Sequence, residues 1–227
     1  MCSKKSNLIV SIDLTNVDDV INMTKAVGPY VCAVKYHCDT WLFPSYSNHY
    51  NDIYMMYVEL HKIAKQYDFL IIEDRKFADI GATVRQQCRN IGSPDFVTVL
   101  PVAGPETIAT ISNYNHSLGQ IIVAEFSTRN NLLKDGSYRE ECAKFSFNEI
   151  SGYVCQSRYL SHTLEMPDEL IYMTPGVHLS ATNDSIDQQY RTPEDAIIRD
   201  GCDAIIVGRG ITQYSSDNDF LKIIFTS

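Results

Sequence analysis

Eight short apolar runs occur along the chain. Between them lie stretches in which apolar residues recur at the spacing of an amphipathic helix. The runs are rich in Val and Ile and too short for helices, which is typical of strands buried on both faces. They occupy residues 8–14, 31–37, 68–74, 95–102, 120–126, 151–157, 169–175 and 202–208. Residues 52–67 and 192–200 are two of the intervening helical patterns. This order predicts parallel βαβ units.

Eight such units in 227 residues favour an α/β fold of the TIM (β/α)8 barrel type, as a single domain over residues 1–227. A doubly wound open sheet is the alternative. The Gly-rich turn that such sheets use after the first strand is missing, and SIDLTNVDD (11–19) stands there instead.

Polar or conformationally special residues stand at the ends of most predicted strands. In a barrel these ends converge on one mouth, where active sites lie. The residues are Asp13, Lys35, Asp74, Ser127, Gln156, Pro175 and Gly208. Any one of them alone could be an ordinary surface residue at the end of a strand. That explanation is much weaker for a set of seven that converges on one face.

Two polar stretches are predicted to contain loops of the barrel. Residues 128–150 begin polar and then become helical, which predicts a loop followed by a helix. Residues 180–193 form a long polar stretch after the seventh strand, and long loops in compact domains are often functional. We expect the second stretch to cover a phosphate group.

The overall charge and the cysteines limit the classes of function. A net charge of −9 makes nucleic acid or an anionic membrane a poor partner, and no apolar run reaches the ~20 residues that span a bilayer. No signal peptide is evident at the N-terminus. Seven scattered cysteines without a C-x-x-C motif favour reduced thiols in the cytoplasm. We disfavour a metal site at residues 37–39, because neighbours in a strand face opposite sides.

The charged sequence around the third predicted strand carries the first candidate chemistry. Asp74 and Lys76 lie two residues apart on one face of a strand that is expected to end near Asp74, and Asp79 follows after a turn. An ammonium held between carboxylates stays protonated, as a proton donor to a reacting carbon requires. A solvated run of charges is the alternative interpretation.

Neighbouring strand ends extend this pattern. Lys35 and Asp13 close the second and first predicted strands, so charges of alternating sign line adjacent strand ends. Such a network satisfies its own charges and still presents a cation and an anion to a ligand. A purely structural ion-pair network is the alternative.

The eighth predicted strand runs into a helix through Gly208-Arg209-Gly210. Small glycines let backbone N–H groups approach an anion, and an arginine binds phosphate oxygens in a bidentate manner. The loops after strands seven and eight are the common phosphate site of TIM barrels. We therefore predict a phosphate site at Gly208 and Arg209.

Taken together, these motifs resemble the orotidine 5′-monophosphate decarboxylase family, in its eukaryotic type. The D-x-K-x-x-D pattern of the family is present at residues 74–79, inside FLIIEDRKFADIGATV (69–84). Further blocks follow in the family's order and extend over nearly the whole chain. They are SIDL (11–14), VKYHCDT (34–40), VAEFS (123–127), MTPGV (173–177), DQQY (187–190) and AIIVGRGI (204–211).

The resemblance implies a homodimeric, stand-alone cytoplasmic enzyme that converts orotidine 5′-monophosphate to uridine 5′-monophosphate, the last step of de novo UMP synthesis, without cofactor or metal. It implies that Lys76 protonates C6 of the pyrimidine. Lys35, Asp74 and Asp79 complete the charged tetrad. The implied substrate contacts are Ser11, Asp13, Ser127, Pro175, Gln188, Tyr190, Gly208 and Arg209, with Asp79, Ile80 and Thr83 reaching the partner subunit's site.

The sequence departs from the family at several positions, and two rival functions stay open. Ala82 stands where Asn is usual, Thr128-Arg129-Asn130 replaces Ser-Thr-Gly, and residues 84–98 are shorter than in relatives. One rival is a Mg²⁺-dependent sugar-phosphate enzyme of the same barrel superfamily. The other is a nucleotide-binding relative with impaired catalysis.

Overall fold

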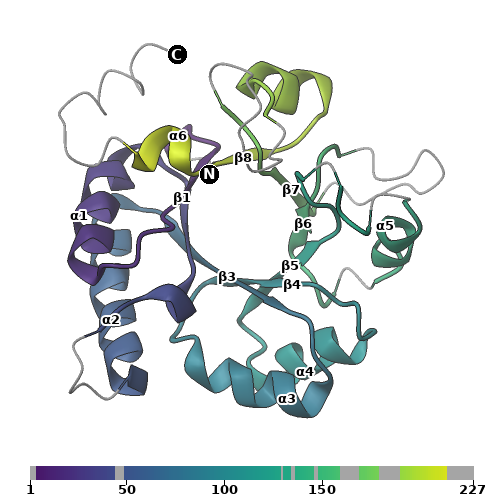
Figure 1. The fold of residues 1–227 in the computed structure, drawn as a ribbon, viewed down its shortest axis with the longest axis horizontal. Coiled ribbons are helices and arrows are strands. Elements are labelled where there is room, and N and C mark those ends of the chain that lie inside the picture. The colour runs from purple at the N-terminus through teal and green to yellow at the C-terminus, as the bar shows by residue number, and fades with distance from the viewer. Residues whose placement is uncertain are drawn as a thin grey trace. The chain divides into compact units, whose positions relative to one another are not determined.

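A computed structural model describes residues 4–43, 49–128, 130–133, 136–145, 148–158, 169–178 and 190–213. The strands in this part of the chain form a closed parallel barrel in the order β1 to β8 (Figure 1). They are β1 (Leu8–Ser11), β2 (Ala33–Tyr36), β3 (Leu70–Phe77), β4 (Phe96–Val99), β5 (Gly119–Val123), β6 (Gly152–Val154), β7 (Ile171–Thr174) and β8 (Ala204–Val207). The predicted TIM barrel is confirmed.

Each predicted strand is present, but the predicted ends differ from the observed ones. Most strands are shorter than their apolar runs, so β1 ends at Ser11 and Asp13 lies beyond it. The strand β3 is longer and includes Lys76, so the prediction that it ends near Asp74 is wrong. The backbone explains the extension, because Leu100 N donates to Phe77 O at 2.8 Å and continues the pairing.

The helices follow the predicted βα order. The α-helices are α1 (Val17–Val27), α2 (His49–Tyr67), α3 (Gly81–Gln87), α4 (Glu106–Tyr114), α5 (Ser137–Cys142) and α6 (Arg209–Thr212). Shorter turns are η1 (Gly28–Tyr30), η2 (Cys38–Thr40), η3 (Cys88–Asn90) and η4 (Asp195–Arg199). The helix predicted at 52–67 lies in α2, whereas the one predicted at 192–200 contains a π-helical turn, η4.

The first helix shows how the sequence sets a helix boundary. Asn16 caps α1, because its side-chain oxygen accepts hydrogen bonds from Asp18 N at 2.9 Å and Asp19 N at 3.2 Å. The two aspartates lie in the first turn, where negative charge is favoured by the helix dipole. On the opposite side of the helix, Val20 and Val27 are fully buried.

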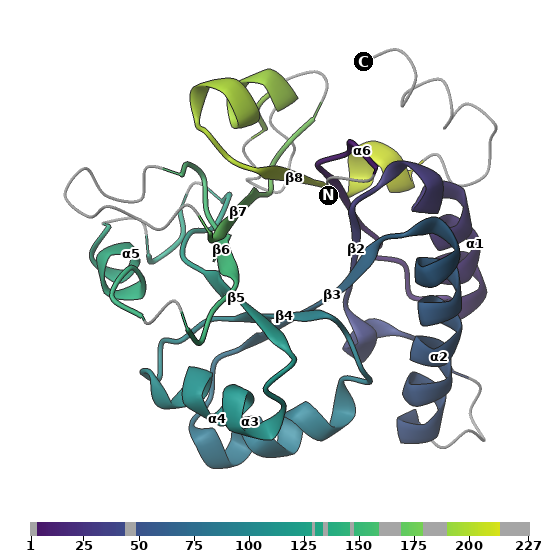
Figure 2. The ribbon, with the colours of Figure 1, turned by 180° about the vertical axis from the view of Figure 1, so that it is seen from behind.

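The chain divides into two compact units, which are described separately below. Unit 1 comprises residues 1–75, 89–95 and 207–227, and unit 2 comprises residues 76–88 and 96–206. In unit 1, α1 and α2 lie side by side along β1 and β2 in both views (Figures 1 and 2). In unit 2, α3 and α4 pack against each other (Figures 1 and 2).

Strand register in unit 1 assigns side chains to the two faces of the sheet. Ser11 pairs with Lys35, and Lys35 pairs with Ile72, so these residues share one face. Side chains alternate along a strand, so Asp74 lies on the face of Ile72, and Glu73 lies on the other face. The Glu73 face is the helix side, because Tyr57 of α2 binds Glu73 there. The first face is the inner face of the barrel.

The polar stretches are only partly described. Residues 128–150 contain a loop and then α5, as predicted. Residues 180–189 of the predicted phosphate-covering loop, which was placed at 180–193, lie outside the described residues. No helix in the described part of the chain is long and apolar enough to span a membrane.

Gly152 of β6 pairs directly with Ile171 of β7, and this contact yields a stability prediction. A Cβ atom at Gly152 would overlap the backbone carbonyl of Ile171, which cannot rotate away. We expect Gly152→Ala to lower the free energy of unfolding by about 3 kcal/mol or more, measured by urea denaturation.

Gly119→Ala is the matched control, because its Cβ would meet the movable ring of Phe96 instead of backbone. It should cost clearly less than Gly152→Ala. Equal effects of the two substitutions would contradict the assignment of the close approach to the backbone.

Candidate active site

A buried ion pair lies on the inner face of unit 1. The Lys35 ammonium donates to Oδ2 of Asp74, and each side chain is only 9% exposed. The two residues come from neighbouring strands, β2 and β3, as the strand order requires. Two opposite charges are therefore held together with little water between them, which is costly unless both are well paired.

His37 joins this pair, although the sequence analysis considered it only as a metal ligand. Its Nε2 lies 3.2 Å from Lys35 Nζ and 3.3 Å from Asp74 Oδ2. It also lies 3.8 Å from Oδ1 of Asp13. Counting residues in steps of two from Lys35 would have placed His37 on the same face.

Asp13 and Ser11 form the next part of the same surface. Ser11 Oγ donates to Asp13 Oδ1 at 2.7 Å, and the Asp13 side chain is 53% exposed. Gly208 lies beside them, since a Cβ atom there would be 3.5 Å from Asp13 Oδ2. The predicted residues Ser11, Asp13 and Gly208 are thus brought together, and Asp13 keeps an open side towards solvent.

Arg209 begins α6 immediately after Gly208 and is exposed. The turn into this helix is fixed by bonds from Ile211 N and Thr212 N to Gly208 O, at 2.9 and 3.0 Å. The guanidinium therefore starts from a fixed backbone position next to Gly208, as the phosphate-site prediction requires.

Lys76 has an unusual backbone conformation. Its φ is +49°, which is in the left-handed region. This conformation is energetically unfavourable for a residue other than glycine, and it persists only where surrounding contacts stabilise it. Its N–H donates to Thr98 Oγ1 at 2.9 Å, and Thr98 is buried in β4 of the same unit. Such strain is concentrated at functional sites, and this observation supports a special role for Lys76.

Asp79, Ile80 and Thr83 lie at the start of α3. The Asp79 carboxylate accepts from Ile80 N at 2.8 Å, and its backbone carbonyl accepts from Thr107 Oγ1 at 2.9 Å. Thr83 N donates to Ile80 O at 3.0 Å. Ile80 is 63% exposed, which is unusual for an isoleucine in a fixed turn. These residues present an exposed carboxylate and an apolar side chain at the surface of unit 2.

The predicted base and phosphate contacts of unit 2 lie after two strands and in the segment before η4. Ser127 follows β5, Pro175 directly follows β7, and both are partly buried. Tyr190 packs edge-on against His178, with ring centroids 5.5 Å apart. Gln188 lies outside the described residues.

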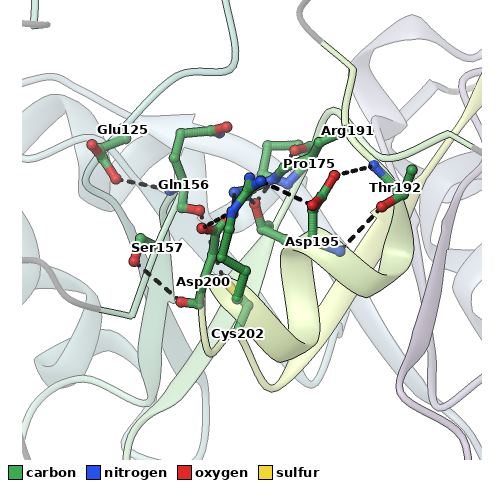
Figure 3. Close-up of polar contacts among 11 residues, drawn as sticks. Glu125, Gln156, Ser157, Pro175, Arg191, Thr192, Asp195, Asp200 and Cys202 are labelled. Atoms are coloured by element: carbon green, nitrogen blue, oxygen red, sulfur yellow. Dashed lines mark hydrogen bonds and ion pairs between the residues drawn. The ribbon is translucent and has the colours of Figure 1, made fainter. Parts of the chain in front are cut away.

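Arg191 anchors the segment that carries Tyr190 to the end of β7 (Figure 3). Its guanidinium binds the Asp200 carboxylate and Thr174 Oγ1. Its backbone pairs with β7's continuation, since Arg191 N donates to Gly176 O and His178 N donates to Arg191 O, each at 3.0 Å. Sequence reasoning missed this residue, because a single arginine in a polar loop gives no signal.

Glu125 fixes the end of β6 in a similar way. Its Oε2 accepts from Gln156 N at 2.8 Å (Figure 3), and its Oε1 accepts from Arg139 Nη1 of α5 at 3.0 Å. Gln156 is thereby held two residues beyond β6. These bonds tie together the ends of β5 and β6, and Ser127 lies two residues after Glu125.

Glu73 is adjacent to Asp74 but faces the helices instead of the inner face. It is fully buried, and Tyr57 OH donates to its Oε2 at 2.7 Å. Cys38 N lies 3.2 Å from both carboxylate oxygens. Burial raises the pKa of Glu73 to about 7, although the bonds from Tyr57 and Cys38 oppose the shift. The charged motif is therefore divided between the two faces of β3.

No group of three or more His, Cys, Asp or Glu within the described ranges is placed to hold a metal ion. Residues 38–40 form the turn η2 and not a strand, so the alternation argument against a metal at residues 37–39 was wrong. These residues do not alternate between the two faces of a strand. Cys38 is buried, and the ring of His37 contacts Asp74 and Lys35.

The raised pKa of Glu73 predicts a dependence of stability on pH. Between its ordinary value of 4.5 and about 7, the carboxyl is protonated in the folded chain and ionised in the unfolded chain. Its contribution to stability is therefore full below pH 4.5 and falls as the pH rises to about 7. The loss amounts to about 3 kcal/mol.

Glu73→Gln removes this titration. Urea unfolding of both proteins between pH 5 and 8 should show the wild-type chain losing stability relative to the variant as the pH rises. A constant difference between the two proteins over that range would contradict the raised pKa.

Comparison with known proteins identifies the family. A family model described as "Orotidine 5'-phosphate decarboxylase / HUMPS family" matches residues 6–219. A protein of Mycosarcoma maydis named orotidine 5'-phosphate decarboxylase is 38% identical over 221 residues, covering 92% of this chain and 75% of that protein. Proteins of the same name from Schizophyllum commune and Phycomyces blakesleeanus are each 37% identical, covering 92% of this chain and 77% of their own length. The chain belongs to the orotidine 5′-phosphate decarboxylase family.

Proposed function

We propose that this chain decarboxylates orotidine 5′-monophosphate to uridine 5′-monophosphate. Its relatives carry the name of that activity, and the family model covers nearly the whole chain. The observation that carries the proposal is the buried pair of Lys35 and Asp74, two residues before Lys76. Loss of carbon dioxide leaves a carbanion at C6 of the pyrimidine, and such a reaction needs fixed charges that water does not surround.

In this mechanism Lys76 is the proton donor. Its ammonium stabilises the negative charge that develops at C6 and then transfers a proton to that carbon, while the C6–CO₂ bond breaks and leaves its electron pair at C6. The left-handed backbone of Lys76, held by Thr98, supports this role. A donor fixed before the reaction costs little reorganisation at the transition state.

Asp74 and Lys35 organise the charges around the reacting carbon. The Asp74 carboxylate is held by Lys35 and His37, so it cannot turn towards water. A fixed carboxylate keeps the neighbouring ammonium charged and positioned. Asp79, from the partner subunit, completes the tetrad in this proposal.

Substrate binding follows from the remaining site residues. Asp13 with Ser11 binds the nucleoside, and the exposed side of Asp13 supports that role. Ser127 and Pro175 contact the pyrimidine. Gln188, Tyr190, Gly208 and Arg209 hold the phosphate. Binding of a remote phosphate lowers the barrier through contacts that play no part at C6.

The proposal includes a homodimer with shared active sites. Asp79, Ile80 and Thr83 reach the site of the partner subunit. The exposure of apolar side chains in this part of unit 2 supports the proposal. The Ile80 side chain is 63% exposed, and that of Val102, which follows β4, is 54% exposed. Exposed apolar side chains at fixed turns are typical of an interface.

The reaction needs no cofactor in this proposal, and it supplies UMP as the last step of its de novo synthesis. A cytoplasmic location fits the described cysteines, which are all free. The rival functions are a Mg²⁺-dependent sugar-phosphate enzyme and an inactive nucleotide-binding relative. The names of the relatives favour the decarboxylase over both.

Lys76→Ala tests the proton donor. The wild-type chain should consume orotidine 5′-monophosphate in an absorbance assay with a metal chelator present. The variant should lose turnover by about 10⁴-fold or more, because both the stabilising charge and the proton are gone, while UMP still binds. Lys65→Ala, at an exposed position of α2, is the control and should be fully active.

Either of two results would overturn this account. Complete loss of wild-type turnover in chelator would favour the metal-dependent rival. Substantial turnover by the Lys76→Ala chain would refute the role of Lys76.

Hybrid dimers test the shared site. Lys76→Ala chains and Asp79→Ala chains should each be inactive alone. Random pairing makes half of the dimers hybrid, each with one complete site, so an equimolar mixture should recover about a quarter of wild-type activity. A mixture that stays inactive after subunit exchange has been verified would show that the site is not shared.

A further inference from the structure

Glu73 is the only carboxylate among the described side chains that is fully excluded from solvent. The mechanism above makes no use of it. A buried carboxylate is expensive, so a chain that keeps one needs partners that repay the cost. One of those partners, Cys38, is adjacent in the chain to His37 of the candidate active site.

Among the described residues, the groups that hydrogen bond to Glu73 come from α2 and η2 of unit 1. Tyr57 donates from α2, and Cys38 N donates from the turn η2. Burial and the nearby Glu73 carboxylate both raise the pKa of the Cys38 thiol, so that thiol stays neutral. His37 directly precedes Cys38 in the chain, so a contact that holds the Cys38 backbone also acts on His37.

The bond to Cys38 fixes the backbone next to His37. Cys38 begins η2, and the turn has no side-chain cap of its own. Its first N–H groups therefore lack partners within the turn, and Glu73 supplies the acceptor for one of them. The peptide between His37 and Cys38 is thus held by a residue on the helix side of the sheet.

On the other face, the ring of His37 bridges the site charges. Its Nε2 lies within 3.3 Å of both Lys35 Nζ and Asp74 Oδ2. Glu73 and Asp74 are consecutive, so one strand holds the His37 backbone from one face and its ring from the other. A shift of the turn would move the ring away from the ion pair.

We propose that Glu73 is a positioning residue of the active site, which sets the His37 ring against Lys35 and Asp74 by anchoring the backbone of Cys38. This inference rests on the proposed decarboxylase function for its kinetic test. The positioning itself is a geometric statement and has a readout without substrate.

The kinetic test compares Glu73→Leu, Glu73→Gln and His37→Ala. Loss of the anchor should lower kcat of Glu73→Leu on the order of tenfold to a hundredfold, as for other small displacements at a catalytic site. KM should change little, because the phosphate contacts are elsewhere. Glu73→Gln keeps an acceptor oxygen and should recover most of the activity. In the Glu73→Leu background, His37→Ala should add almost no further loss.

Thr24→Val is the matched control. It removes a buried side-chain hydrogen bond of similar kind, between the hydroxyl groups of Thr24 and Tyr36 of β2, on the helix side of the same sheet. It should lower stability without changing kcat or the effect of His37→Ala. If Glu73→Leu does not fold, the same cycle is run with Tyr57→Phe, which removes the other donor to Glu73.

The readout without substrate is the histidine NMR spectrum of the ¹⁵N-labelled chain, with His37 assigned from His37→Gln. The His37 ring signals should shift in Glu73→Leu, or in Tyr57→Phe if Glu73→Leu does not fold, and stay unchanged in Thr24→Val. Unmoved signals together with additive kinetic losses would overturn the positioning role. An inactive wild-type chain with shifted signals would sink the decarboxylase proposal and leave the positioning intact.

Discussion

The site of unit 1 depends on one interaction, the buried pairing of Lys35 with Asp74. Each side chain is only 9% exposed, so neither charge is compensated by water. The desolvation cost of such a pair is offset only if both members stay together and are further hydrogen bonded. His37 supplies that further contact, and it brings Asp13 and Ser11 into the same network. The geometry of the nucleoside side of the site follows from this constraint.

Strand alternation lets a single segment serve both structure and chemistry. Asp74 faces the ion pair, whereas Glu73 faces α2 and the turn η2. Lys76 follows in the same strand with a left-handed backbone. The charged residues of this run therefore lie in different environments, and each acts according to the face of the strand it occupies.

The sequence predicted the eight strands and the barrel, because period and run length are local properties that burial in a parallel sheet imposes. It also predicted Lys35, Asp74 and Asp13 as one cluster, because strand order places β1, β2 and β3 side by side. It did not predict that β3 extends through Lys76, since that extension depends on partners beyond the strand's own residues, namely the backbone N–H of Leu100 and the side-chain hydroxyl of Thr98.

The roles of His37, Glu73 and Arg191 were not predicted for related reasons. The period of two places His37 on the face of Lys35 but does not show which side chains its ring contacts, and the direction of Glu73 depends on which face of β3 is packed by α2. The anchoring contacts of Arg191 join Thr174 of β7 to Asp200, directly after η4, and these residues are far apart in the sequence. Tertiary contacts decide all three, whereas pattern and propensity describe neighbours along the chain.

The most direct test of this account is a double-mutant cycle on the ion pair, read by the free energy of unfolding. Lys35→Met and Asp74→Leu each leave one buried charge without its partner, and each should cost about 3–5 kcal/mol. The double variant removes both charges and should recover most of that loss. If the two losses simply add, the pair is not the constraint on which the site depends.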